Sequence, residues 1–176
     1  MTTPELIADE RLTLMGLLAE TWAAVGARAS AHLAAFGLAP VEFEVCLRLA
    51  RSPAGQLRMS DLAAQTTLTS SGATRVVDRL VERGLVTRLS CEHDRRLTYT
   101  VLSEQGRELL DRVLPGHLDL LEAWLVSPLR TADRAAFEDA LRAVRDHAAP
   151  CSTAGSDGSA LPQPGSRSRS QEMSAP

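Results

Sequence analysis

The feature that most constrains this 176-residue chain is a change of residue periodicity at Gly84. Before Gly84, "TSSGATRVVDRLVER" repeats apolar residues at helical spacing, and after it "LVTRLS" and "LTYTVLS" alternate apolar with polar residues. The first pattern predicts a helix and the second predicts two β-strands, while glycine is common just past a helix end. A short helix, "SDLAAQTT", is predicted before this stretch. The order helix, turn, helix and β-hairpin is that of a winged helix-turn-helix.

Helices are also predicted on both sides of this unit. Residues 5–36 carry apolar side chains three and four positions apart, which predicts one long amphipathic helix, broken near Gly26. A second helix begins at Pro40, and two more are expected within 103–148. We therefore expect a mainly α-helical fold with a small β-hairpin wing.

The terminal helices carry more Leu, Val and Trp side chains than a small winged helix can cover. At about 25 cal/mol per Å2, leaving them in water would cost many kcal/mol, and pairing two copies removes that cost. We expect a single domain over 1–149, with a DNA-binding lobe at 40–102 and N- and C-terminal dimerisation helices at 5–36 and 103–148. Residues 150–176, rich in Pro, Gly and Ser, are predicted to be a disordered tail.

Several classes of protein are disfavoured by the sequence. We find no Gly-rich phosphate loop after a strand and neither HExxH nor GxSxG, so we expect no enzyme, cofactor or metal site. The acidic start "MTTPELIADER" is unlike a secretory signal, and the apolar run near it is interrupted by Glu20. Three cysteines in unrelated contexts fit a reducing compartment. A cytoplasmic protein with no membrane partner is the expectation.

The basic charge of the chain is gathered in one stretch. The net charge is −3, yet residues 69–96 hold six arginines against four acids. A recognition helix in the major groove needs a small first turn with free N–H groups, followed by longer donors. These requirements predict a set of DNA-contacting residues on the helix: Thr69, Ser70, Ser71, Gly72, Thr74, Arg75 and Arg79.

Within this set, Arg75 is the candidate for reading a guanine, and Arg79 for lying nearer the DNA backbone. An alternative stays open, in which the helix is merely a solvated surface whose Arg75 and Arg79 pair with Asp78 and Glu82.

The polar loop "CEHDRR" supplies a second candidate contact, at the tip of the wing. Arg95 and Arg96 are adjacent there, and a guanidinium entering a narrow minor groove meets strong negative potential. Asp94 beside them can hold one guanidinium and leave the other pointing forward. Helix and wing together predict a protein that binds double-stranded DNA.

Residues 59–110, "MSDLAAQTTLTSSGATRVVDRLVERGLVTRLSCEHDRRLTYTVLSEQGREL" with the Leu that follows, resemble the DNA-binding core of the multiple-antibiotic-resistance regulator (MarR) family. The most specific matches are "VDRLVERGLV" and the "DRR" wing followed by a strand and "LSEQGRELL". The resemblance implies a bacterial, homodimeric, ligand-responsive repressor on a pseudo-palindromic operator. It also implies that Arg96 is the wing arginine and Asp94 the acid that orients it.

The same resemblance implies a small-molecule effector, held between the dimerisation helices and the DNA-binding lobe. Four residues are candidates to line such a site: Trp22, His32, Phe43 and His117. Each also has an ordinary structural role, as packing or as an exposed histidine.

Two other functions stay open. A winged helix can bind another protein instead of DNA. Alternatively, Cys91, flanked by Arg88 and Arg95, could sense oxidants because positive charge lowers a thiol pKa; Cys46 is expected to be buried packing. A metal site at Cys91 and His93 is disfavoured because two ligands do not close a tetrahedral site.

Overall fold

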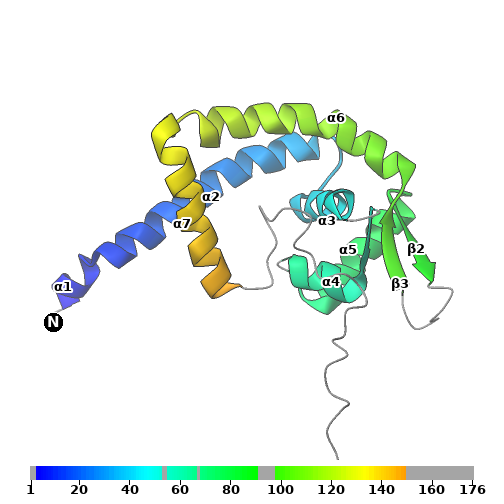
Figure 1. Ribbon diagram of the computed structural model, residues 1–176, viewed down its shortest axis with the longest axis horizontal. Helices are drawn as coiled ribbons and strands as arrows, with labels where there is room; N and C mark the ends of the chain where they lie inside the picture. Colours follow the sequence, from blue (N-terminus) through cyan, green and yellow to red (C-terminus); the bar gives the residue numbers. More distant parts are fainter. Residues whose placement is uncertain (1–2, 53–54, 67, 91–97, 150–176) are drawn as a thin grey trace, which may run out of the picture.

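The computed structural model describes residues 3–52, 55–66, 68–90 and 98–149. Its helices are α1 (Thr3–Ile7), α2 (Glu10–Ala34), α3 (Pro40–Arg51), α4 (Met59–Gln65), α5 (Ser70–Glu82), α6 (Glu104–Leu121), the π-helical turn η2 (Glu122–Val126) and α7 (Thr131–Ala148). Its strands are β1 (Gln56–Arg58), β2 (Val86–Ser90) and β3 (Thr98–Leu102). The mainly α-helical winged helix-turn-helix is therefore confirmed (Figure 1).

The small sheet has three strands, one more than the sequence predicted. β3 lies in the middle, with β1 and β2 antiparallel on either side. Thr100 faces Leu57 of β1 and Arg88 of β2, and its side chain is fully buried. β1 connects the end of α3 to α4, so the sheet joins the wing to the helix-turn-helix.

The hydrophobic core lies in the winged-helix lobe, which we define as residues 40–102. It is built from apolar side chains of α3, α4, α5 and the strands, and it is completed by Leu33 and Leu38 and by Leu109, Leu110 and Val113 of α6. Val77 and Leu80 are fully buried on the inner side of α5. This packing presents the other side of α5 to solvent.

The terminal helices extend away from the lobe. α2 and α6 run beside each other above α3, and α7 turns back across α2 in the view of Figure 1. The predicted break in the N-terminal helix at Gly26 is wrong, because α2 continues through it. The interruption lies at Asp9, whose carboxylate accepts from the Arg11 N–H and caps α2. None of the described helices has the length and apolar character of a transmembrane span.

The end of α5 and the start of α6 are in direct backbone contact. Gly84 has φ +71°, the left-handed conformation that ends a helix, as its position in the sequence predicted. The Ser103 hydroxyl caps α6 by accepting from Gly106 N–H, and it donates to the Gly84 carbonyl at 2.7 Å. A Cβ on Gly106 would lie only 2.3 Å from the Leu85 carbonyl oxygen. Only glycine at position 106 allows this close approach.

Candidate nucleic-acid interface

The first turn of α5 is small, polar and exposed. Thr69 is the N-cap, and its hydroxyl accepts from the Gly72 N–H at 3.1 Å. Ser70 and Ser71 are exposed on this turn, and the Thr74 hydroxyl donates back to the Ser70 carbonyl. With no acidic residue in this turn, the positive end of the helix dipole is left available to an anion.

Arg75 stands out among the arginines of this region. It is exposed on α5, and within the described residues it has no hydrogen-bond or ion-pair partner. Arg79 and Arg83 instead contact Glu42 of α3, at 3.1 and 2.9 Å. Arg75 is thus the α5 arginine whose whole guanidinium is available to an external group.

The intrahelical ion pairs of the alternative, in which α5 is merely a solvated surface helix, are not found among the described residues. That alternative required Arg75 and Arg79 to pair with Asp78 and Glu82 on the same helix. Asp78 pairs with Arg88 of β2 instead, at 2.7 Å, and Arg79 pairs across to α3. Asp78 and Glu42 are thus paired with other arginines and do not neutralise Arg75.

The predicted wing contacts Asp94, Arg95 and Arg96 lie outside the described residues, as do Cys91 and His93. The strands that carry this segment are described: β2 and β3 pair from Val86–Leu102 to Ser90–Thr98. The two strands are therefore fixed to the lobe, and the roles of Asp94, Arg95 and Arg96 stay predictions.

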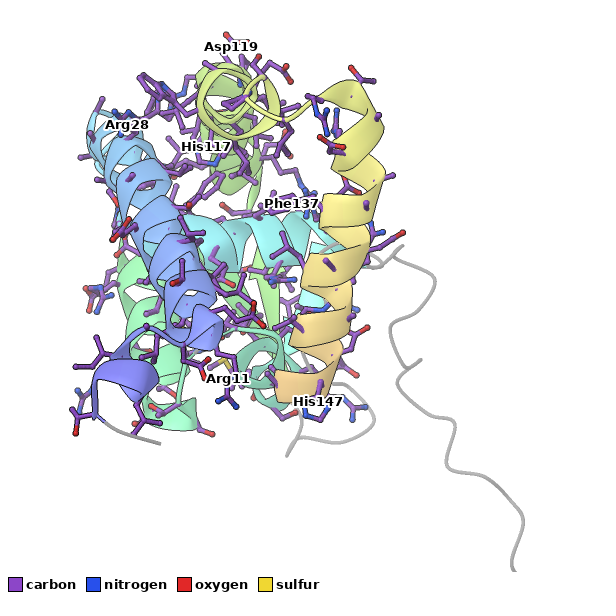
Figure 2. The ribbon with its side chains drawn as sticks, turned by 90° about the vertical axis from the view of Figure 1, so that its left-hand side faces the viewer. Arg11, Arg28, His117, Asp119, Phe137 and His147 are labelled. Atoms are coloured by element: carbon purple, nitrogen blue, oxygen red, sulfur yellow. The ribbon has the colours of Figure 1, made fainter. Side chains whose placement is uncertain are left out.

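Three of the four predicted effector residues come together where α2, α3 and α6 meet. The rings of Phe43 and His117 are 4.7 Å apart, and those of His32 and His117 are 5.9 Å apart. His32 Nε2 lies 3.0 Å from the Val113 carbonyl and so donates to it. His117 Nδ1 is buried and is the one such side-chain atom without a partner in the described part of the chain. Figure 2 shows His117 under α6, beside α2.

Burial lowers the pKa of His117, and the neighbouring His32 lowers it further. The imidazole of His117 is therefore kept neutral near pH 7. A neutral ring with an unpartnered nitrogen, tilted against the ring of Phe43, offers one hydrogen-bonding atom beside an aromatic side chain.

Trp22 does not join this cluster. It lies ten positions before His32 on the same helix, which separates them by about 15 Å along its axis. Its side chain is 78% exposed in the single chain. The structure therefore argues against Trp22 as a neighbour of the other three residues.

Cys46 is buried in the lobe, as the sequence predicted. Burial, reinforced by the charge of Glu42, raises the pKa of the Cys46 thiol to about 12. It is protonated at neutral pH and unsuited to sensing oxidants. Within the described ranges, no three His, Cys, Asp or Glu side chains are placed to hold a metal ion.

Comparison with known proteins agrees with this geometry. The family model described as "MarR family" matches residues 36–97. The regulator MhqR of Bacillus subtilis is 28% identical over 63% of this chain and 75% of its own length. The transcriptional repressor MprA of Escherichia coli is 31% identical over 62% of each chain.

Among solved structures, Sco3205, a MarR family transcriptional regulator from Streptomyces coelicolor in complex with DNA, has a TM-score of 0.74 and is 27% identical. The similarity covers 80% of this chain and 92% of Sco3205. Family model, relatives and fold agree: residues 36–97 match the MarR family, and the chain is similar to winged-helix transcriptional regulators of that family.

Proposed function

We propose that the chain is a sequence-specific DNA-binding repressor, with α5 as the recognition helix. The observation that carries the proposal is Arg75, exposed and without a partner among the described residues, in the second turn of a helix that opens with small polar residues. A guanidinium in that position can donate two hydrogen bonds to the O6 and N7 of a guanine. Repression is favoured because the similar MprA is named a transcriptional repressor.

The exposed apolar side chains of the terminal helices support a homodimer. On α2, Leu14, Met15, Leu18 and Trp22 share one side of the helix, and each is 47–78% exposed in the single chain. Leu118, Trp124, Leu141 and Val144 are similarly exposed on α6, η2 and α7. Apolar surface of this extent is typical of an interface, and a two-fold dimer would present two recognition helices to a pseudo-palindromic site.

The cluster of His32, Phe43 and His117 supports a small-molecule effector. The unpartnered Nδ1 of His117 and the adjacent Phe43 ring favour a planar molecule that carries a hydroxyl or carbonyl group. The effector would act where α2 and α6 meet the lobe. A thermal-shift screen of phenolic and purine compounds tests this, with His117→Phe as the variant that should lose the shift.

DNA binding is tested by titrating the chain on a duplex that it selects from a randomised pool. Arg75→Ala should weaken this specific binding about 10- to 100-fold, the usual cost of losing a bidentate base contact. Arg96→Ala should weaken it as well and lower the salt dependence by about one counterion. Arg134→Ala on α7 is the control, since it removes an exposed arginine far along the chain.

Two results would contradict the proposal. One is a duplex affinity that the double variant Arg75→Ala, Arg96→Ala leaves unchanged. The other is an affinity that does not respond to salt, which would favour the alternative of a winged helix that binds another protein.

A further inference from the structure

Glu42 is a charged residue in the core of the winged-helix lobe. Only 6% of it is exposed, and its two oxygens accept three hydrogen bonds. Arg79 Nε donates to Oε1 at 3.1 Å, while Arg83 Nη1 at 2.9 Å and Ala39 N–H at 3.1 Å donate to Oε2. A buried carboxylate is tolerated only when paired in this way.

These bonds join two helices that are far apart in sequence. Glu42 lies in the first turn of α3, and its carboxylate also closes the cap of that helix. Arg79 lies in the last turn of α5 and Arg83 is its C-cap, so the carboxylate holds the end of that helix at two points one turn apart. Arg83 also lies beside the turn after α2, with Nη2 3.8 Å from the Cβ position of Gly37.

The direction of Arg75 depends on how α5 is rotated. Arg75 lies one turn before Arg79, about 6 Å along the helix axis and about 40° around it. Apolar packing by Val77 and Leu80 holds the other side of α5, but hydrophobic contact is not directional. Charge-assisted hydrogen bonds are directional, so the pair on Glu42 restricts the rotation and sliding of α5.

We propose that Glu42 is a positioning residue for DNA recognition. It fixes the rotation of α5 through Arg79 and Arg83, and so sets the direction in which Arg75 points. This inference rests on the proposed function for its DNA-binding consequence. It also gives Arg79 two roles. Its Nε donates to Glu42, while its half-exposed guanidinium faces solvent and is available for the predicted contact near the DNA backbone.

The test compares Glu42→Gln with Glu44→Gln. Both changes remove one negative charge from α3 at constant size, but Glu44 pairs with Arg48 inside that helix and not with α5. Affinities are measured for the selected duplex and for a scrambled one. Glu42→Gln should lower the ratio of specific to non-specific affinity about tenfold, while Glu44→Gln should keep it within about twofold.

The ratio of specific to non-specific affinity distinguishes a change in the orientation of Arg75 from a loss of stability. A variant that is only less stable loses folded protein, which weakens binding to both duplexes equally. A misoriented Arg75 weakens the specific complex alone. Removal of a negative charge leaves non-specific binding unchanged or makes it stronger. Arg83→Gln is the second variant should Glu42→Gln not fold, because it leaves Glu42 paired with Arg79; a ratio lowered about threefold is expected.

Amide hydrogen exchange supplies a readout that needs no DNA. Glu42→Gln should speed exchange in α5 and not in α6, whereas Glu44→Gln should change neither. Equal exchange in α5 for the two variants, or an unchanged affinity ratio, overturns the positioning role. Should the unaltered chain select no duplex, the proposed function fails, and the exchange measurement alone still decides whether Glu42 holds α5.

Discussion

The winged-helix lobe and the terminal helices are stabilised in different ways. Nearly every buried apolar residue lies in the lobe or on the parts of α2 and α6 next to it, between Leu33 and Val113. By contrast, α7 has no buried residue and α2 has only Leu33. The core is therefore centred on the lobe, whereas most apolar residues of the terminal helices are exposed in the single chain. The proposed assembly would therefore use a part of the chain that contributes little to the buried core.

The largest effect is expected from a cavity in the lobe. Leu80→Ala should lower the free energy of unfolding by about 2–5 kcal/mol, because Leu80 is fully buried and the space left behind is not refilled. Urea denaturation measures the change. The neighbouring Val81→Ala, at a position 36% exposed, should cost about 1 kcal/mol or less. Equal losses for the two variants would mean that the lobe has no closed core of its own.

A second substitution acts on the terminal helices and should change assembly instead. Leu14→Glu with Leu18→Glu places charges on the apolar side of α2, and each leucine is worth about 1.5–3 kcal/mol when buried. The dimer dissociation constant should rise about a hundredfold or more, as measured by light scattering. Thr13→Glu, on the opposite side of α2, is the control. A double variant that remains dimeric would show that this side of α2 is not the interface.

A smaller effect on stability is expected at the N-termini of two helices, α5 in the lobe and α7 among the terminal helices. Thr69→Ala removes the hydroxyl that caps α5 and should cost about 1 kcal/mol of stability. Thr131→Ala at the start of α7 should cost much less, because α7 has no side-chain cap. Thermal unfolding of the two variants, with Thr69→Ser as the rescue, checks this. The idea is wrong if Thr69→Ala and Thr131→Ala unfold at the same temperature.

The smallest effect is expected at the junction of the two regions. The pKa of His117 is lower in the folded chain than the value of about 6.5 in the unfolded chain. Just below that pH the unfolded chain binds more protons, so stability should fall as the pH drops from about 7 to below the folded pKa. His117→Phe should flatten this pH dependence, while His147→Phe near the end of α7 should not. Denaturation at several pH values measures both slopes.

The order of the elements could be predicted from sequence because its signals are local. The change of periodicity at Gly84 and Pro40 at a helix start each act within a few residues, and the structure confirms both. β1 was missed because a three-residue strand has too few positions to show alternation, and its pairing with β3 bridges more than forty residues. The boundaries predicted for the lobe and the dimerisation helices remain predictions.

The candidate site was only partly predictable, because local sequence signals do not show contacts between residues far apart in the chain. The exposed, polar start of α5 follows from local composition. The partner of Arg79 does not: sequence spacing favoured acids on the same helix, whereas Glu42 is 37 positions away. The meeting of Phe43 with His117 is likewise a tertiary contact. The remoteness of Trp22 from His32, by contrast, could have been calculated from helical rise alone.

The close approach at Gly106 has a mechanical consequence. Because no side chain separates the start of α6 from Leu85, the backbone of the long helix lies directly against the segment that follows α5. In the proposed dimer, a tilt of α6 at the subunit contact would change the orientation of α5 at the opposite end of α6. A change of a few degrees in the angle between the subunits would then be enough to move the two proposed recognition helices out of register with the helical repeat of the DNA.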